Sequence, residues 1–290
     1  MIVAGTRAEL RAARGLLPGP VVLVPTMGAL HDGHRALLRR AREVAGQTGS
    51  VAVSIFVNPL QFGPNEDLDR YPRALSDDLK ACAAEHVDLV FAPSAREMYP
   101  ARQLVMVDPG PAGEILEGQF RPGFFRGVLT VVLKLFSLVR PDVAVFGQKD
   151  AQQLTLVRQM VSDFALDIEI DAVPTVRAAD GLALSSRNKY LSSAERSVAP
   201  VLHTALAAGA AAAAGGPRAV LDAARKVLDS AAGALGLDYI ALVERETYAP
   251  VRDDDFAGAA VLALAARLGG TRLIDNVVIR FGTGRDAADD

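Results

Sequence analysis

The sequence predicts an α/β fold in which a doubly wound parallel β-sheet is followed by a smaller C-terminal α+β domain. Short β-branched apolar runs alternate with segments of helical periodicity over the first 175 residues, which is the pattern of βαβ units. Beyond residue 174 the chain becomes alanine-rich and then forms three closely spaced strand-like runs. Hydrophobic residues make up 50% of the 290, enough apolar material for a core in each part.

The first strand is predicted over residues 21–26. Its run of valine and leucine is typical of a strand buried on both faces. A proline and a glycine then end the strand. Apolar residues recur at helical spacing after this turn, so a helix is expected over residues 34–45.

The rest of the first part continues this alternation. Further strands are expected over 50–58, 88–92, 143–147 and 168–173, and further helices over 75–85, 127–139 and 151–164. Parallel sheets bind ligands beyond the carboxyl ends of their strands. Three polar motifs directly follow predicted strands, and we therefore expect them to converge at one edge of the sheet. These motifs contain His31 and His34, Asn58 and Gln61, and residues 147–150.

The second part is predicted to contain helices and a small antiparallel sheet. Helices are expected over 192–214 and 218–228, with Gly215-Gly216-Pro217 between them, and strands over 238–245, 260–267 and 272–279. The expected domains are therefore residues 1–175 and 176–281, followed by a tail over 282–290.

Composition excludes several classes of protein. The net charge is −3 with mixed signs, which provides no basic stripe for nucleic acid and no polybasic patch for a membrane. The single cysteine, Cys82, excludes an intramolecular disulfide and fits a reducing compartment. No apolar run has membrane-spanning length, and the first residues do not resemble a signal peptide. We expect a cytoplasmic protein.

Two histidines open the helix that follows the first predicted strand. His31 and His34 are three residues apart, so both rings lie on one side of the first turn. Backbone N–H groups and the helix dipole favour a phosphate at such a position. Solvated turn histidines or half of a metal site would have the same spacing, but the strand–turn–helix context favours nucleotide chemistry.

Amides and carboxylates follow the next strand. Asn58 and Gln61 can recognise carboxyl or hydroxyl groups, although Asn58 before a proline is also common in turns. Asp77 and Asp78 begin a predicted helix. They either complement its dipole or provide a carboxylate for a nucleotide-bound Mg²⁺.

A third motif, Gly147-Gln148-Lys149-Asp150, joins a strand to a helix. Its glycine permits close approach of a ligand, Lys149 offers a charge for phosphate, and Asp150 can cap the helix. Gln153 lies one turn further on. A capped surface helix would also fit this tetrapeptide.

Two arginine-containing segments complete the set. Leu184-Ser185-Ser186-Arg187 offers two hydroxyls and a guanidinium, which suit a polyphosphate, although a plain polar loop has the same composition. The loop over residues 119–127 carries Arg121 and Arg126, which face either a phosphate or solvent.

Taken together, these motifs resemble the pantoate–β-alanine ligase family of the nucleotidylyltransferase superfamily. The resemblance extends over nearly the whole chain, and its most specific parts are residues 56–62 and Ser185-Ser186-Arg187-Asn188. It implies a Rossmann-like N-terminal domain that binds nucleotide and pantoate, a smaller C-terminal lid, and a cytoplasmic homodimer. The implied reaction joins pantoate to β-alanine, with ATP and Mg²⁺, through a pantoyl-adenylate.

The resemblance also implies roles for individual residues. His34 would be the catalytic histidine, acting with His31 and Lys149. ATP would contact Met27, Gly28, Ala29, Leu30, His31, Asp32, Gly33, His34, Gly147, Gln148, Lys149, Asp150, Val176, Leu184, Ser185, Ser186 and Arg187. Pantoate and β-alanine would contact Gln61, Gln153 and Asn58, and Asp77 and Asp78 would lie near Mg²⁺.

Two positions depart from the family pattern, and three other functions are weighed against it. Phe124 stands where the family most often has histidine, and Leu184 where it often has methionine. AMP transfer to a phosphate ester would favour a basic acceptor pocket over Gln61 and Gln153. A class I aminoacyl-tRNA synthetase would need a tRNA-binding surface, and a nucleotide sensor would bind ATP without releasing pyrophosphate.

Overall fold

The computed structural model describes residues 1–64 and 66–282, and the chain divides into two compact units. The first unit comprises Met1–Gln148 and Gln152–Val176. The second unit comprises Lys149–Ala151 and the chain from Arg177 onward. The expected tail over 282–290 lies outside the described residues except for Gly282.

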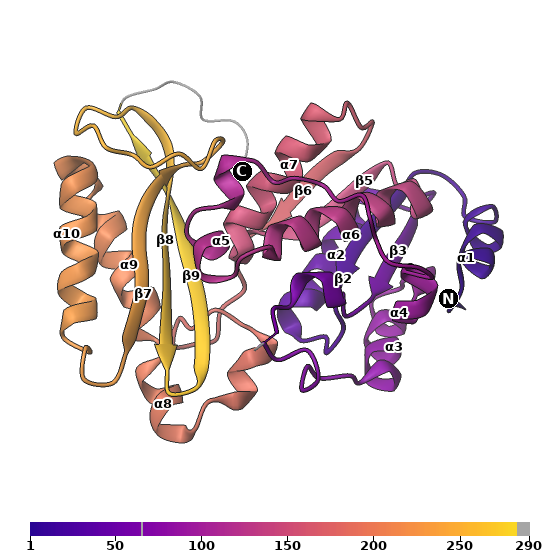
Figure 1. Ribbon diagram of the computed structural model, residues 1–290, viewed down its shortest axis with the longest axis horizontal. Helices are drawn as coiled ribbons and strands as arrows, with labels where there is room; N and C mark the ends of the chain where they lie inside the picture. The colour runs from indigo at the N-terminus through magenta and orange to yellow at the C-terminus, as the bar shows by residue number, and fades with distance from the viewer. Residues whose placement is uncertain (65, 283–290) are drawn as a thin grey trace. The chain divides into compact units, whose positions relative to one another are not determined.

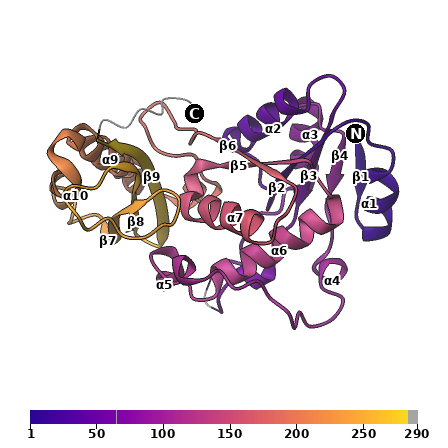
Figure 2. The same ribbon diagram turned by 90° about the horizontal axis from the view of Figure 1, so that it is seen from above.

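The first unit is built on a parallel sheet, as predicted. Its described residues form six strands: β1 (Ile2–Ala4), β2 (Val21–Thr26), β3 (Ser50–Ile55), β4 (Leu89–Phe91), β5 (Val143–Gly147) and β6 (Glu169–Val173). The spatial order is β1-β4-β3-β2-β5-β6, and all pairings are parallel (Figures 1 and 2). The predicted strand over 50–58 is shorter than expected, because Asn58 caps a short 3₁₀ turn, η1 (Pro59–Gln61).

Helices cover both faces of this sheet. The described helices of this part of the chain are α1 (Arg7–Arg14), α2 (Asp32–Ala45), α3 (Leu75–Ala84), α4 (Ala95–Met98), α5 (Glu117–Phe120), α6 (Phe124–Val139) and α7 (Ala151–Asp163). Along β2, Val21 and Leu23 belong to the core cluster that includes α6, and Val22 and Val24 belong to the cluster that includes α2. This alternation is the doubly wound arrangement that the fold class predicts.

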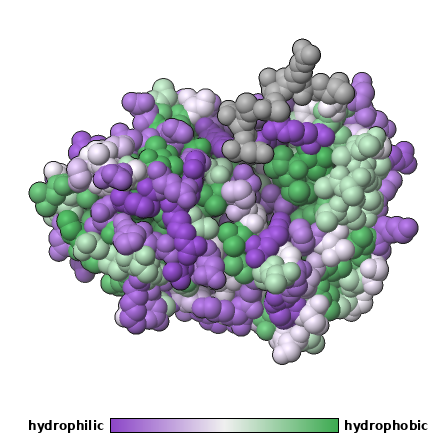
Figure 3. Space-filling model, turned by 180° about the vertical axis from the view of Figure 1, so that it is seen from behind, coloured by the Kyte–Doolittle hydropathy of each residue, from purple (hydrophilic) through white to green (hydrophobic). Residues whose placement is uncertain are grey.

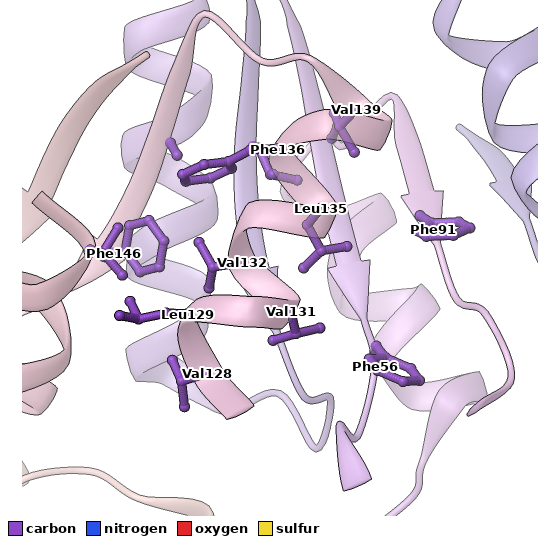
Figure 4. Close-up of a cluster of buried hydrophobic side chains, with 14 of the residues drawn as sticks. Phe56, Phe91, Val128, Leu129, Val131, Val132, Leu135, Phe136, Val139 and Phe146 are labelled. Carbon is purple, nitrogen blue, oxygen red and sulfur yellow. The ribbon is translucent and has the colours of Figure 1, made fainter. Parts of the chain in front are cut away.

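The larger core lies under α6. Figure 4 shows its apolar side chains beside aromatic rings carried by neighbouring strands and loops. Phe136 packs edge-on against Phe146 of β5, with 6.5 Å between the ring centroids. α6 begins at Phe124, earlier than the predicted residue 127, and its extra first turn places Phe124 beside the site described below.

Two elements near the N-terminus were not predicted. β1 has three residues and pairs only along β4, so its sequence carries little periodic signal. α1 is better encoded: Thr6 and Glu9 form a capping box, each side chain bonding the other residue's backbone N–H. A threonine followed three residues later by glutamate is a signal that could have revealed this helix.

The second unit consists of helices beside an antiparallel sheet, as predicted. Its helices are α8 (Ser193–Val198), α9 (Val201–Ala211) and α10 (Gly216–Asp229), and its strands are β7 (Gly236–Glu244), β8 (Gly258–Leu268) and β9 (Thr271–Phe281). β8 lies between β7 and β9. The single helix predicted over 192–214 is wrong: Pro200 separates α8 from α9, because its ring removes a backbone donor.

Among the described residues, no single helix is long and apolar enough to cross a membrane. The bent pair Ser193–Ala211 and Ala213–Asp229 meets the length and composition requirements only when taken together. On the face drawn in Figure 3, hydrophilic residues are mixed with apolar ones, in keeping with a chain in which 22% of residues are charged.

Candidate active site

The strand order places three of the predicted motifs on neighbouring strands of the first unit. β3 and β5 flank β2, and the chain leaves β2 toward β3 first and reaches β5 later. The carboxyl ends of β2 and β5 therefore form the point where the strand order reverses. Ligands of open parallel sheets bind at such a point. His31 and His34 follow β2, Gln61 follows β3, and Gly147 ends β5.

The two histidines form a reciprocal cap at the start of α2. His31 is the N-cap residue, and its Nδ1 accepts the N–H of Gly33 at 3.1 Å. The Nδ1 of His34 accepts the N–H of His31 at 3.2 Å. The ring centroids are 4.1 Å apart. The prediction that both rings lie on one side of the helix start is confirmed.

This cap fixes which nitrogen of each ring carries a proton. An imidazole nitrogen that accepts a hydrogen bond is unprotonated, so each neutral ring has its proton on Nε2. Both rings can then donate through Nε2 beside the N–H groups of the first helical turn. Such donors suit the oxygens of a phosphate, since the helix dipole favours negative charge at the same place.

The loop between β2 and α2 is held by a buried carboxylate. Gly28 and Ala29 both have positive φ, 81° and 52°. The carboxylate of Asp78, on α3, accepts the N–H of Ala29 at 3.0 Å and the N–H of Leu30 at 2.7 Å. Asp78 is only 3% exposed.

The neighbouring Asp77 behaves differently. Its side chain is 77% exposed and bonds to Lys80 at 2.8 Å. The two carboxylates therefore do not share one site, and both oxygens of Asp78 already accept backbone N–H groups. Among the described residues, no group of three or more His, Cys, Asp or Glu is arranged to hold a metal ion. The expected Mg²⁺ site at Asp77 and Asp78 does not fit this geometry.

Gln61 connects the loops that follow β3 and β2. Its Oε1 accepts from Asn58 at 3.0 Å, and its Nε2 lies 3.1 Å from the sulfur of Met27. Asn58 is 1% exposed and also bonds the N–H of Leu60, the carbonyl of Gly127 and the hydroxyl of Tyr99. All four hydrogen-bonding positions of the Asn58 amide are thus used within the protein. The geometry favours Asn58 as a support for Gln61 over a direct substrate ligand.

Arg121, the C-cap residue of α5, supports the same loop. It bonds both carboxylate oxygens of Glu66 and donates to the carbonyl of Gln61 at 3.2 Å. Its guanidinium carbon lies 3.6 Å from the centroid of the Phe124 ring. Phe124, the departure from the family pattern, therefore stacks on the arginine that supports Gln61. Arg126, the second arginine of this loop, is exposed and pairs with Asp108.

The predicted motif after β5 forms the 3₁₀ turn η3 (Gln148–Asp150), which leads into α7. Gly147, Gln148 and Gln153 belong to the first unit, whereas Lys149 and Asp150 belong to the second. Gln153 is half-buried in the first turn of α7. Its neighbour Gln152 is buried and bonds the carbonyls of Ala112 and Ile115, so it has a structural role.

The second unit carries the other residues expected at ATP. Ser185 caps the 3₁₀ turn η4 (Ser186–Tyr190) by accepting the N–H of Arg187 at 3.3 Å. Ser186 is buried, and Leu184 and Arg187 are half-buried. Val176 is half-buried at the end of the first unit.

Sequence reasoning missed an ion pair beside this turn. Arg177 bonds both carboxylate oxygens of Asp275 on β9, which is 3% exposed. The adjacent Asn276 donates to the carbonyl of Lys149 at 2.9 Å. An Asp-Asn pair inside an apolar strand is the signal that could have indicated a buried polar contact.

Three buried or half-buried groups of the first unit, Glu85, Cys82 and Tyr99, have altered acidity. Hydrogen bonds from Arg39 and Arg35 lower the pKa of Glu85, which keeps this carboxylate charged at the end of α3. Burial and the charge of Asp78 raise the pKa of Cys82 to about 11, so this thiol is not a nucleophile at neutral pH. Burial raises the pKa of Tyr99, which therefore stays a hydroxyl donor to Asn58.

Comparisons with known proteins agree with the motifs. The family model described as pantoate-beta-alanine ligase matches residues 3–278. A pantothenate synthetase from Thermobifida fusca is 60% identical over 285 residues, covering 95% of each chain.

Solved structures are similar as well. A crystal structure of pantothenate synthetase from Thermus thermophilus matches with a TM-score of 0.89 at 47% identity, covering 96% of this chain and 99% of that one. A pantoate-beta-alanine ligase from Francisella tularensis, complexed with beta-gamma ATP and beta-alanine, matches with a TM-score of 0.77 at 35% identity over 96% of this chain and 97% of that one.

Proposed function

This chain belongs to the pantoate–β-alanine ligase family, and we propose that His31 and His34 stabilise the transferring phosphate in its reaction. The chain condenses (R)-pantoate with β-alanine in an ATP-dependent reaction that proceeds through pantoyl-adenylate and releases AMP and pyrophosphate. The resemblance inferred from the sequence motifs is thereby confirmed. AMP transfer to a phosphate ester and aminoacylation of tRNA are not the reactions of this family.

One observation carries the proposed role of the histidines. Their Nδ1 atoms are occupied in the cap of α2, which leaves Nε2 as the proton-bearing nitrogen of each ring at the end of β2. In the first step a carboxylate oxygen of pantoate attacks the α-phosphorus of ATP, and the bond to pyrophosphate breaks. Charge builds on the phosphoryl and pyrophosphate oxygens, where preorganised N–H donors are most effective. No nucleophilic side chain is needed, because the substrate supplies the nucleophile.

The remaining residue roles are proposals supported by the resemblance and by position. We propose that ATP contacts residues 27–34 and 147–150, Val176 and residues 184–187, with Lys149 on a phosphate. Gln61 and Gln153 are proposed to bind pantoate. Asn58 is reassigned from substrate ligand to support for Gln61, since its amide is fully bonded within the protein.

In the second step the amine of β-alanine attacks the acyl carbon of pantoyl-adenylate. The new C–N bond forms as the C–O bond to AMP breaks, and the amine releases a proton. This step depends mainly on positioning and on the exclusion of water. We propose that the second unit serves as a lid for that purpose, as the resemblance implies.

Three further proposals concern the surroundings of the reaction. Mg²⁺ is proposed to accompany ATP, but no step is assigned to it because Asp77 and Asp78 do not form a shared site. We propose a homodimer on the basis of the resemblance. Measuring the molecular mass of the protein in solution tests this proposal. A cytoplasmic location is supported by the single buried Cys82.

The deciding experiment is mass spectrometry of the products formed from ATP, Mg²⁺ and D-pantoate, with and without β-alanine. We expect pantothenate and AMP only when β-alanine is present, and enzyme-bound pantoyl-adenylate when it is absent. ATP binding without either product would identify a nucleotide sensor instead and would contradict the proposed roles.

A further inference from the structure

The first turn of α3 directs a buried carboxylate onto the loop that precedes the histidines. Asp78 uses its Oδ2 for the N–H of Ala29 and its Oδ1 for the N–H of Leu30. Leu30 directly precedes His31, the N-cap residue of α2. The carboxylate is thus bonded to the backbone next to the first of the two imidazoles.

The loop has a conformation that needs such support. Ala29 has a φ of 52°, a region that non-glycine residues seldom adopt. A Cβ on Gly28 would meet Oδ2 of Asp78 at 2.8 Å and Ile55 at 3.0 Å, so the carboxylate lies directly against this backbone. Without Asp78, this mostly buried loop would lose the two hydrogen bonds that the carboxylate accepts from the N–H groups of Ala29 and Leu30.

The other end of α3 holds the other side of the histidine segment. Glu85, the C-cap residue of α3, bonds Arg35 at 2.7 Å and Arg39 at 2.9 Å, both on α2. α3 therefore contacts the chain before His31 through Asp78 and the chain after His34 through Glu85. The reciprocal cap of the two histidines lies between these anchors.

We propose that Asp78 is a positioning residue for adenylate formation, which holds the Met27–Leu30 loop so that His31 and His34 present Nε2 to the phosphate. The inference rests on the proposed role of His34. A carboxylate is suited to this task because both of its oxygens accept hydrogen bonds, whereas an amide offers one acceptor and one donor. Its nearby charge is also one reason why the pKa of Cys82 is raised.

The test is a single-turnover measurement of pantoyl-adenylate formation by the full chain with Asp78→Asn. Asparagine has the same shape but turns an N–H group toward a backbone N–H group. We expect the rate constant to fall by roughly 10–100-fold, the scale of a misplaced catalytic group, with the KM for pantoate changed by less than about threefold. Glu43→Gln at the far end of α2, exposed and paired with Arg40, is the control, and its rate constant should stay within about twofold of wild type.

A double-mutant cycle separates positioning from a general structural role. If Asp78 acts through His34, the rate constant of the double variant should be less than about threefold lower than that of His34→Ala alone. Equal losses in both backgrounds would overturn the proposal. Recovery of the Asp78→Asn rate constant at high Mg²⁺ would also overturn it, because it would identify Asp78 as a metal ligand. A rate constant of Asp78→Asn within twofold of wild type would do the same.

Two further controls keep the outcomes distinct. Asp78→Glu retains the charge but displaces the carboxylate oxygens, so a positioning role predicts a rate constant between those of Asp78→Asn and wild type. If Asp78→Asn does not fold, Asp78→Glu replaces it in the double-mutant cycle with His34→Ala. Failure of wild type to form adenylate would contradict the proposed function. The outcome is different if wild type forms adenylate at a normal rate, His34→Ala is slow and Asp78→Asn is as fast as wild type. That result would contradict only the inference about Asp78.

Discussion

The two units place their buried carboxylate and amide side chains differently. In the first unit, Asn58, Gln61 and Asp78 lie in loops or in the first turn of a helix, outside the strands. In the second unit, Asp275 and Asn276 lie within β9 itself and bond to Arg177 and to the backbone of Lys149. The parallel sheet collects polar groups beyond its strand ends, whereas the antiparallel sheet uses them to attach neighbouring segments.

This difference follows from the topology. Parallel strands all end at the same edge, so loops that are distant in sequence converge there without interrupting the apolar core. Adjacent strands of an antiparallel sheet end at opposite edges, and a polar group on such a strand contacts whatever packs beside it. We therefore expect substitutions at the strand ends of the first unit to reduce rate or binding, and core substitutions in the second unit to reduce stability.

The largest expected effect is on rate in the first unit. His34→Ala should lower the rate constant of adenylate formation by roughly 10²–10⁴-fold, since it removes a preorganised donor to the transferring phosphate. Rapid-quench measurement of pantoyl-adenylate in a single turnover gives this rate directly.

Two variants make the His34 result specific. His34→Gln can still bond the N–H of His31, as glutamine does in a capping box, so it should keep the helix start while losing the imidazole and the rate. His86→Asn, at an exposed left-handed position after α3, should remain within about twofold of wild type. A loss of only a few-fold in His34→Ala would remove this residue from the mechanism.

The next effect concerns stability in the second unit. Leu262 is fully buried on the central strand β8, and its side chain occupies the space into which a Cβ on Gly209 of α9 would point. Leu262→Ala should lower the free energy of unfolding by about 2–5 kcal/mol, through lost burial and the cavity left behind. Urea denaturation measures this change, and below the transition we expect the rate of adenylate formation to stay within about threefold.

Leu237→Ala is the matched control for this core substitution. Leu237 is 41% exposed on β7, so its truncation should change stability by less than about 0.5 kcal/mol. A large loss of rate in Leu262→Ala, with the protein still folded, would break the division between the two units.

Periodicity and composition were sufficient to predict most of the fold. The β-branched run of β2 and the helical spacing of α2 are local signals, and the structure confirms both elements. β1 was not predicted because a strand of three residues is too short to show a period in its hydrophobic pattern. The break between α8 and α9 was missed because the alanine-rich composition concealed the effect of Pro200.

Much less of the site could be predicted in this way. Residue type and strand ends indicated His31, His34 and Gln61, because parallel topology brings such positions together. The roles of Asp78 and Asn58 could not be predicted, since both depend on which backbone groups remain unpaired after folding. A carboxylate at a helix start has the same appearance in sequence whether it holds a metal ion or a loop.

A smaller effect distinguishes substrate binding from chemistry within the first unit. Gln61→Ala should weaken pantoate binding by about tenfold, the scale of one or two lost neutral hydrogen bonds. The affinity for ATP should stay within about twofold. Calorimetric titration of each substrate measures both values. Equal losses of affinity for pantoate and for ATP would mean that Gln61 supports the Met27–Leu30 loop and does not act as a pantoate ligand.

The smallest expected effect comes from the departure at Phe124. The ring lies against the guanidinium of Arg121, which in turn donates to the carbonyl of Gln61. Phe124→His retains a ring for stacking when it is neutral but places a second cation there below the ordinary histidine pKa of about 6.5. Stacking of this kind contributes about 0.5–1 kcal/mol, so we expect a KM for pantoate within twofold of wild type at pH 8 and a rise of roughly 2–5-fold at pH 6. Phe124→Leu, which cannot become charged, should show the same KM relative to wild type at both pH values. If Phe124→His also shows no dependence on pH, the stack on Arg121 does not reach the substrate through Gln61.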